Sequence, residues 1–430
     1  MNNNHVYDMI VVGGGPGGYT AALYAARAGL DTIVLEKLSA GGQMALTEQI
    51  DNYPGFENGI DGFSLAEKMQ KQAERFGARS EYAEVLRMDL TAVPKLLETS
   101  EGIFRGKTVV LATGADPRTL CVAGEAELVG RGVAYCAACD GMFYKGKTVV
   151  VVGGGNSAAA DALLLSRVAK KVILVHRRDA LRATKIYHEP LARAENVEFR
   201  WNSTVSALLS GDRLTGVRLL DTVSGEESVV DCDGVFVSVG RQPATALAAG
   251  QLTLDGGGYI VAGETTETSI PGVYAVGDVR TKPLRQVVTA VADGAVAVHM
   301  AEKYIVDWIW RDNISPDLTR VILSAITLAV CLADMSASPL RDTVTGEESV
   351  VDCDGVFVSV GRQPATALAV GQLALDDGGY IGAGETTETS SPGVYAVGNV
   401  RTKPLRQVVT AVADGAVAVH MAEKYIAENR

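Results

Sequence analysis

Apolar and polar residues follow the same order in two stretches of the chain, Met9–Lys37 and Thr148–Arg178. Each stretch begins with a short apolar run, Ile10–Val12 or Val149–Val152, and continues through three glycines into an Ala- and Leu-rich segment of helical character. A second apolar run closes each stretch. Apolar runs on either side of a helix predict a β-α-β unit with parallel strands. The pattern therefore predicts an α/β fold that contains this unit twice.

Both units carry the glycine pattern of a dinucleotide-binding turn. The first glycine permits a tight turn, the second lets the backbone approach a pyrophosphate, and the third small residue lets the helix pack close to the strand. The helix N-terminus then offers free N–H groups to the phosphates. A purely structural turn is the alternative, and the position of each motif between a strand and a helix argues against it. We therefore expect two Rossmann-like dinucleotide-binding domains. The residues of the motifs are Gly13, Gly15, Pro16 and Gly18 in the first unit and Gly153, Gly155, Asn156, Ser157 and Ala158 in the second.

The residue that ends the second strand of each unit selects the dinucleotide. Glu36 offers a carboxylate that accepts hydrogen bonds from the two hydroxyls of an adenosine ribose. His176 stands at the equivalent position and is followed by Arg177, Arg178 and Arg182. Guanidinium groups bind a 2′-phosphate, which a carboxylate would repel. We expect FAD or NAD in the first unit and NADP(H) in the second, and the alternative for the arginines is an exposed basic patch.

Cys136 and Cys139 form a C-x-x-C pair shortly before the second glycine turn. Such a pair can close a small disulfide, and one of its thiols typically has a lowered pKa. Half of a zinc site is the alternative, but structural zinc needs four ligands, and the sequence offers no second C-x-x-C pair and no suitable His spacing. Two dinucleotide sites beside a dithiol predict an electron relay from a nicotinamide through a flavin to a disulfide. The other cysteines, expected to be inert core thiols, are Cys121, Cys232, Cys331 and Cys353.

Composition narrows the choice of function. The chain has 430 residues, of which 47% are hydrophobic and 21% charged, so we expect at least two folded domains. The formal net charge of −12 argues against a nucleic-acid-binding surface. The longest charge-free apolar run, Val321–Ala333, has 13 residues, short of the roughly 20 that a membrane-spanning helix needs. The N-terminus does not read as a signal peptide. We therefore expect a cytoplasmic protein with no nucleic acid, membrane or metal among its partners.

The chain also contains a long internal repeat. Residues Asp221–Ile305 recur as Asp342–Ile426, and only seven of the 85 positions differ. Such near-identity indicates a recent partial duplication, or an error in assembling the gene, rather than a stacking repeat. One difference affects a candidate site, because Asp278 of the first copy is Asn399 in the second.

Several further short motifs accompany the glycine turns and the cysteine pair. They are Gly41-Gly42-Gln43, Asn52-Tyr53-Pro54-Gly55, Ala112-Thr113-Gly114-Ala115, Cys136–Asp140, His176-Arg177-Arg178-Asp179, Gly277-Asp278-Val279 and Arg285-Gln286. With all of these together, the chain from Tyr7 to Ile305 resembles the low-molecular-weight bacterial thioredoxin reductases. The resemblance implies a homodimeric enzyme that contains FAD and uses NADPH to reduce thioredoxin.

The resemblance also implies roles for single residues. Cys139 would lie against the flavin, Cys136 would attack the disulfide of thioredoxin, and Asp140 would relay protons. The arginines, His176 and the second glycine turn would bind NADPH. The residues implied for FAD, besides the first glycine turn, are Glu36, Gly42, Gln43, Asn52, Thr113, Gly114, Asp278, Arg285, Gln286 and Val287.

The implied domains are interleaved along the chain. An FAD domain would comprise residues 1–116 and 238–305, with an NADPH domain, 117–237, inserted between its parts and a hinge at the two crossovers. A joint, 306–341, the duplicate, 342–426, and a short tail, 427–430, have no counterpart in the family. We expect the first copy to complete the FAD domain, because its connection is short and it retains Asp278. The displaced second copy would then expose apolar faces. Two alternatives to a thioredoxin reductase stay open: a related flavin reductase that supplies a peroxidase or another dithiol partner, and an inactive duplication product or binding scaffold.

Overall fold

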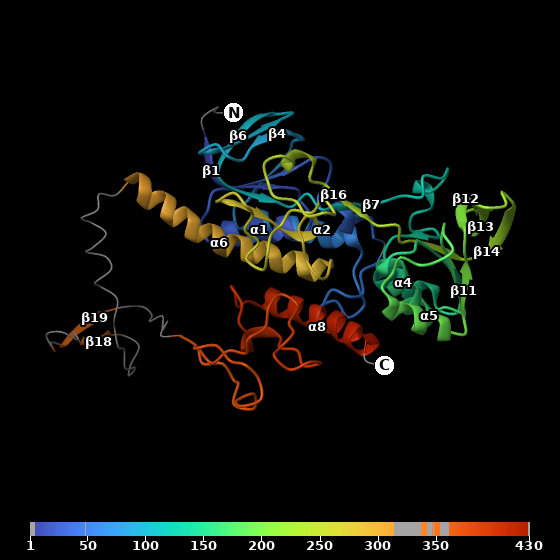
Figure 1. Cartoon of the computed structure of the whole chain (residues 1–430). Coiled ribbons are helices and arrows are strands. Elements are labelled where there is room, and N and C mark those ends of the chain that lie inside the picture. The colour runs from blue at the N-terminus through green and yellow to red at the C-terminus, as the bar shows by residue number, and fades with distance from the viewer. Residues whose placement is uncertain are drawn as a thin grey trace.

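The chain folds into two sheet-based bodies, and residues 361–428, which contain most of the second copy, pack beside them (Figure 1). The computed structural model describes residues 5–47, 49–313, 337–341, 346, 348–352 and 361–428. The α/β class with two β-α-β units, predicted from the two glycine-containing stretches, is confirmed. In the described part of the chain, no helix combines the length and the apolar character needed to pass through a lipid bilayer.

The first body is a seven-stranded sheet in the order β3-β2-β1-β6-β5-β4, to which β17 adds by pairing with β6. Strands β1, β2, β3, β6 and β17 are parallel, and Ile10 of β1 lies between Ile33 of β2 and Val109 of β6. The apolar run in β1 does not alternate, because side chains on both faces are buried: Ile10 belongs to one hydrophobic cluster and Val11 to another. The strands are β1 (Val6–Val12), β2 (Thr32–Glu36), β3 (Arg79–Tyr82), β4 (Val85–Asp89), β5 (Lys95–Thr99), β6 (Gly102–Leu111) and β17 (Val273–Ala275).

Three helices accompany this sheet. Helix α1 (Pro16–Arg27) connects β1 to β2, and α2 (Gly62–Arg75) and α6 (Val287–Asn313) pack against α1. Helix α6 continues past Ile305, the last residue of the first copy, to Asn313. No Gly or Pro occurs between Ile305 and Asn313 to stop it, and the Lys107 ammonium lies 5.1 Å from the Trp308 ring centroid.

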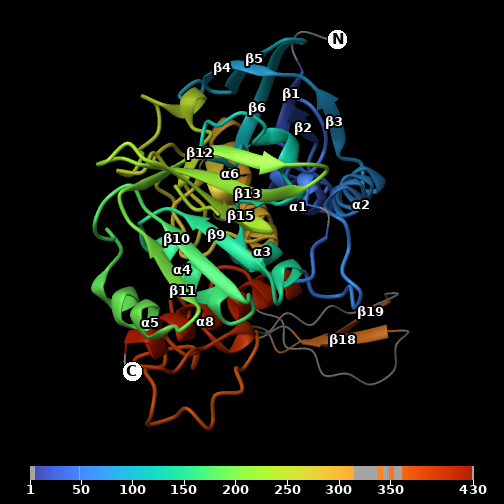
Figure 2. The ribbon, with the colours of Figure 1, turned by 90° about the vertical axis from the view of Figure 1, so that its right-hand side faces the viewer.

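The second body contains a five-stranded parallel sheet in the order β11-β10-β9-β15-β8. A separate antiparallel sheet, β12-β13-β14, packs beside it (Figure 2). The strands are β8 (Val133–Ala134), β9 (Thr148–Val152), β10 (Lys171–Val175), β11 (Val197–Arg200), β12 (Ser203–Ser210), β13 (Leu214–Asp221), β14 (Glu227–Asp231) and β15 (Gly234–Val237). The helices are α3 (Ala137–Asp140), α4 (Asn156–Ser166) and α5 (His188–Arg193).

Two short antiparallel strands connect the bodies. The chain leaves the first sheet through β7 (Ala115–Pro117) and returns through β16 (Arg241–Pro243), and these strands pair with each other. After β16 the chain contributes β17 and α6 to the first body. The first sheet therefore contains strands from before and after the second body.

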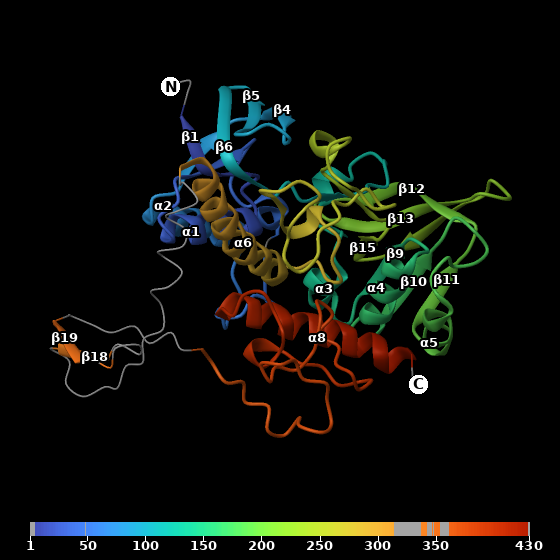
Figure 3. The same ribbon diagram turned by 60° about the vertical axis from the view of Figure 1, so that its left-hand side comes forward.

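The second copy lies outside both sheets, as Figure 3 shows for its long helix α8 (Val408–Glu428). As expected, the first copy supplies the strand on β6, namely β17. Helix α8 packs on α6 instead of on a sheet. The expected exposure of apolar faces is also confirmed: Val298 is 2% exposed, but its counterpart Val419 is 63% exposed. Joint residues 314–336, with the apolar run Val321–Ala333, lie outside the described residues.

Candidate functional site

The first glycine turn connects β1 to α1. Gly13 has a φ of +101°, and a Cβ there would stand 2.5 Å from the Ala112 carbonyl oxygen, so only glycine fits. Gly15 is the N-cap residue of α1, and no side chain hydrogen-bonds to this helix end. A Cβ on Gly15 would meet no heavy atom within 4 Å. Pro16 is the first residue of the helix, where its missing N–H costs nothing. The turn therefore presents free backbone N–H groups to an open space.

Gly18 and Glu36 both contact the backbone of this turn, Gly18 from helix α1 and Glu36 from the end of β2. A Cβ at Gly18 would stand 2.0 Å from the Gly13 oxygen, so its absence lets α1 approach the strand. The Gly14 N–H donates a 2.5 Å hydrogen bond to Glu36 Oε2. The carboxylate at the end of β2 is thus next to the glycine turn, as the β-α-β register requires.

The second glycine turn repeats this geometry between β9 and α4. Gly155 caps α4 without a side-chain cap, and a Cβ there would again meet no heavy atom within 4 Å. Ala158 is fully buried against the sheet, whereas Ser157 is exposed in the first turn of α4. Asn156 Oδ1 accepts a 2.8 Å hydrogen bond from the Thr184 N–H. Gly153, with a φ of +152°, approaches the Ser238 carbonyl.

His176 lies directly against the second turn, and three exposed arginines surround it. A Cβ on Gly154 would stand 2.2 Å from the imidazole, and the His176 Nε2 is buried without a hydrogen-bond partner. Burial lowers the pKa of His176, and the positive charges of Arg182, Arg178 and Arg177 lower it further. A positive potential that repels a proton attracts an anion. This corner therefore fits a phosphate group.

Other predicted FAD residues lie where the first sheet meets the crossover strands. Gln43 Nε2 donates to Asp116 Oδ1 at 2.9 Å, and Thr113 Oγ1 donates to the Ala244 carbonyl at 2.7 Å. Gly114 accepts a 3.0 Å hydrogen bond from the Ala244 N–H. Gly42 begins the short 3₁₀ helix η1 (Gly42–Leu46). These contacts connect the loops of the first body to both crossover segments, since Asp116 lies in β7 and Ala244 directly follows β16.

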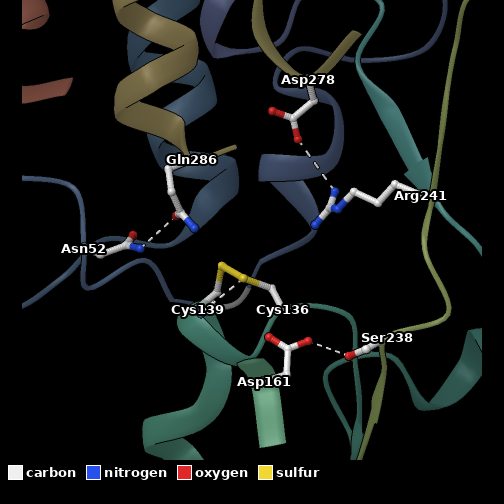
Figure 4. The surroundings of a disulfide bond; sticks show 8 residues. All are labelled: Asn52, Cys136, Cys139, Asp161, Ser238, Arg241, Asp278 and Gln286. Atoms are coloured by element: carbon white, nitrogen blue, oxygen red, sulfur yellow. Dashed lines mark hydrogen bonds and ion pairs between the residues drawn. A yellow bond between two sulfur atoms is a disulfide. The ribbon is translucent and has the colours of Figure 1, made fainter. Parts of the chain in front are cut away.

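A second group gathers at the N-terminus of α6. Asn52 Nδ2 donates to Gln286 Oε1 at 3.0 Å (Figure 4). The Arg285 guanidinium lies 4.0 Å from the Tyr259 ring centroid, and its Nε is buried without a partner. Val287 starts the helix. The structure thus brings Asn52 close to two segments that lie more than two hundred residues later in the sequence.

Asp278 forms an ion pair that the sequence analysis missed. Its Oδ2 lies 3.7 Å from Arg241 Nη1 in the returning crossover strand, and Figure 4 shows the two side chains pointing toward each other. Asp278 follows β17 in η6 (Gly277–Val279), at the carboxyl end of the parallel sheet where ligands bind in α/β folds. The position of Arg241 just after Gly240 offered no signal, because the contact is made between separate elements.

Cys136 and Cys139 form a disulfide with their Cα atoms 5.3 Å apart. Both are half-buried, and Cys136 is the N-cap of α3. In Figure 4 the disulfide lies between two polar groups, with Asn52, Gln286, Asp278 and Arg241 on one side and Asp161 and Ser238 on the other. Asp140, the last residue of α3, is half-buried. The disulfide is therefore positioned between the predicted flavin-binding residues and the second body.

Asp161 and Ser238 were not predicted. Asp161 lies on α4, and its Oδ2 accepts a 2.5 Å hydrogen bond from the Ser238 hydroxyl at the end of β15. Burial raises the pKa of Asp161, although the Ser238 hydroxyl and Arg241 act in the opposite direction. An acidic residue in the otherwise apolar run Ala158–Leu165 was the available signal.

The thiols outside the pair differ in exposure. Cys232 is buried, as expected, but Cys121 is exposed, so the prediction of a core thiol at that position is wrong. Cys121 adopts a φ of +61° in a surface turn, where it contacts the Thr119 hydroxyl at 3.3 Å. Cys331 and Cys353 lie outside the described residues.

Comparison with known proteins gives consistent matches. The model of the family described as pyridine nucleotide-disulphide oxidoreductases matches residues 7–294 and again residues 330–415. The thioredoxin reductase of Listeria monocytogenes is 45% identical over 301 residues, which are 70% of this chain and 94% of that protein. The thioredoxin reductase of Bacillus subtilis is 42% identical over 306 residues, 71% of this chain and 96% of that protein. The crystal structure of thioredoxin reductase from Streptococcus pyogenes superimposes with a TM-score of 0.67 at 41% identity, covering 71% of this chain and 99% of that one.

Proposed function

Since the chain belongs to the family of pyridine nucleotide-disulphide oxidoreductases, we propose that it is an NADPH-dependent thioredoxin reductase. The observation that carries the proposal is the Cys136–Cys139 disulfide, which lies between two bodies that each present an uncapped, glycine-led helix N-terminus. The net reaction transfers two electrons and one proton from NADPH, and one proton from solvent, to the disulfide of thioredoxin. The products are NADP⁺ and a dithiol.

We assign FAD to the first body. Its pyrophosphate would bind at the open turn of Gly13, Gly15, Pro16 and Gly18, and Glu36 would release its hydrogen bond with Gly14 to accept the ribose hydroxyls. Bound FAD supplies two-electron exchange between a nicotinamide and a disulfide. The unpartnered Arg285 Nε and the open space at Gly15 support the fit of this ligand. The other residues assigned to FAD are Gly42, Gln43, Asn52, Thr113, Gly114, Asp278, Gln286 and Val287.

We assign NADPH to the second body. The unpartnered His176 Nε2 and the three arginines around it fit a 2′-phosphate, which would provide the missing hydrogen-bond acceptor. The pyrophosphate would bind at the N-terminus of α4. The residues assigned to NADPH are Gly153, Gly155, Asn156, Ser157, Ala158, His176, Arg177, Arg178 and Arg182.

The cysteines perform the last chemical steps. After reduction, the Cys136 thiolate attacks one sulfur of the thioredoxin disulfide, forming a mixed disulfide and releasing a thioredoxin thiolate. The Cys139 thiolate then attacks Cys136 Sγ, which releases the second thioredoxin thiolate and restores the Cys136–Cys139 disulfide. Asp140 would hold and transfer a proton at these sulfurs, because a leaving thiolate must be protonated.

The domain boundaries follow the same proposal. Residues 1–116 and 238–305 would form the FAD domain and residues 117–237 the NADPH domain, with β7 and β16 as the hinge. We propose a cytoplasmic protein with thioredoxin as its macromolecular substrate. We propose the homodimer implied by the family resemblance for a body that ends at Ile305, because in the full chain the duplicated block covers one face of that body.

Anaerobic titration with NADPH tests the assignment. The purified protein should be yellow and bleach on addition of NADPH. A Cys139→Ser variant should still bleach but lose thioredoxin turnover, because the mixed disulfide cannot resolve. Cys121→Ser is the matched control, because it removes an exposed thiol outside the pair, and it should keep both activities. A properly folded protein without bound flavin, or a Cys139→Ser variant that still turns over thioredoxin, would contradict the proposal.

A further inference from the structure

The two copies of the repeat face each other and form two reciprocal ion pairs. Arg280 Nη2 lies 2.5 Å from Glu385 Oε1, and Arg401 Nη2 lies 2.6 Å from Glu264 Oε1. Arg401 is the counterpart of Arg280, and Glu385 is the counterpart of Glu264, each at a shift of 121 residues. The arginine at this repeat position in each copy therefore forms an ion pair with the equivalent glutamate of the other copy.

The residues around each arginine are also the same in both copies. Asp293 binds Arg280 at 2.7 Å, and Asp414 binds Arg401 at 2.7 Å. The arginine side chains are 3% and 4% exposed, and the two bridging glutamates are 28% and 29% exposed. Both charge clusters are thus buried to the same extent. A chance contact between a displaced block and a protein surface would not reproduce this symmetry.

The apolar part of the contact is symmetric as well. Helices α6 and α8 pack together, and a pocket lies between the copies. Every residue that lines this pocket is matched by its counterpart from the other copy. Examples are the pairs Pro283 and Pro404, Leu284 and Leu405, and Val296 and Val417. The two faces therefore complement each other in shape, in apolar character and in charge.

This arrangement is that of an isologous interface, in which residue i of one copy contacts residue j of the other and j contacts i. We propose that the face formed by Glu264, Arg280 and α6 is a self-association surface, and that the duplicated block occupies it in place of a second chain. The full chain is then a monomer with an internal half-partner. A chain that ends at Ile305 leaves the same face free and pairs with a second copy of itself.

Competition between the block and a second chain favours the block. Because the block belongs to the same chain, its effective concentration at the face is on the order of a millimolar. At micromolar protein concentration a second chain with the same contacts is therefore displaced. The seven differences between the copies leave Glu264, Arg280, Lys282 and Asp293 unchanged, so the block retains every charge of the contact.

Sedimentation equilibrium of the full chain and of a chain ending at Ile305 is the first test. The shortened chain corresponds to complete relatives, since 301 residues of this chain cover 94% of the Listeria protein. The full chain should sediment at 45.1 kDa, and the shortened chain at twice its own mass. Glu264→Arg in the shortened chain should restore the monomer, because it places like charges in both reciprocal pairs. A dimeric full chain or a monomeric, folded shortened chain would overturn the proposal.

Charge reversal in the full chain gives a second test that needs no truncation. Glu385→Arg opposes Arg280 and should release the block, so that the intact first-copy face dimerises. Adding Glu264→Arg to this variant should return it to a monomer. Glu388→Arg is the matched control, because Glu388 is exposed and has no ion pair in the described part of the chain; it should stay monomeric. If Glu385→Arg also stays monomeric, the proposal fails, whatever the bleaching by NADPH shows about the enzyme.

Discussion

The Ser238 hydroxyl donates a 2.5 Å hydrogen bond to the Asp161 carboxylate beside the Cys136–Cys139 disulfide. Ser238 follows β15, where the chain leaves the second body, and Asp161 lies on the helix that starts at the second glycine turn. The pair therefore connects the crossover to α4, the helix whose N-terminus we assign to NADPH. Burial raises the pKa of Asp161, so the charged carboxylate is costly at this position.

Asp161→Asn should stabilise the protein at neutral pH. With the folded-state pKa above the unfolded value, the cost of charging Asp161 is fully present above the folded pKa and disappears below the unfolded one. The variant should raise Tm by about 2–4 °C at pH 8 and have little effect at pH 3, below the ordinary carboxyl pKa of 3.8. Thermal unfolding at both pH values checks this. Asp212→Asn, at an exposed hairpin, serves as control, and an equal gain at acidic and neutral pH would contradict the argument.

Replacing Arg177 and Arg178 with alanine should weaken NADPH far more than NADH. A charge-assisted hydrogen bond contributes roughly 1.5–3 kcal/mol, so the KM for NADPH should rise about 10- to 100-fold while that for NADH changes little. Initial rates with both coenzymes measure the ratio. Arg213→Ala removes an exposed arginine of the same body and should leave the ratio unchanged. Equal effects on both coenzymes would show that these arginines do not select the 2′-phosphate.

The two described thiols outside the disulfide should react differently with iodoacetamide. Burial raises the pKa of Cys232 to about 12, and nearby Asp233 adds to the shift. Since the thiolate is the reactive form, Cys232 should stay unlabelled at pH 8, whereas exposed Cys121 should be alkylated. Peptide mass spectrometry of the oxidised protein distinguishes them. Labelling of Cys232 before unfolding would mean that the connection between β14 and β15 opens in the native state.

Asp293→Ala should destabilise the first body strongly. Asp293 is buried between Arg280 and Lys282, both at 2.7 Å, and the Gly277 N–H also donates to it. Burial raises the pKa of Asp293, but the two cations outweigh this effect and hold it below its ordinary value. Its contribution is therefore present above the unfolded pKa and lost as the pH falls through the folded one. Removal takes the ion-pair carboxylate from buried Lys282 and leaves buried Arg280 with Glu385 alone, so it should cost about 3–5 kcal/mol.

The matched variant Asp414→Ala makes the same change in the second copy, where Arg401 and Lys403 replace the two cations. It should weaken the duplicated block and leave bound flavin in place. Calorimetry and flavin absorbance distinguish the variants. Equal loss of flavin in both would indicate that the block supports the first body more than their contact suggests.

Local signals in the sequence were enough to predict the elements that form the two nucleotide turns. Gly13 and Gly153 follow apolar strands, and their backbone requirements are read from neighbouring residues, so β1, α1, β9 and α4 were found. The cysteine pair was equally local. Each of these features depends on residues within one β-α-β unit.

Contacts between distant elements could not be predicted in this way. The ion pair of Arg241 and Asp278 joins a crossover strand to the end of β17, and the bond of Ser238 and Asp161 joins two other elements. Their existence depends on tertiary packing, which single-sequence patterns do not contain. The extension of α6 to Asn313 was not predicted, because the family resemblance ends at Ile305. The sequence itself has no Gly or Pro after Ile305 that would end the helix there. The position of the second copy was missed because a self-complementary face has no linear motif.

Helix α8 also contacts the second body, and this contact differs in character from the one with α6. Glu423 lies 3.5 Å from Arg167, and both side chains are more than half exposed. Exposed ion pairs contribute at most about 1 kcal/mol, whereas the arginines toward α6 are 3% and 4% exposed. If the second body rotates away about β7 and β16, the exposed ion pair between Glu423 and Arg167 should break before the buried contacts with α6. The duplicated block would then move together with the first body and would not prevent rotation at the hinge.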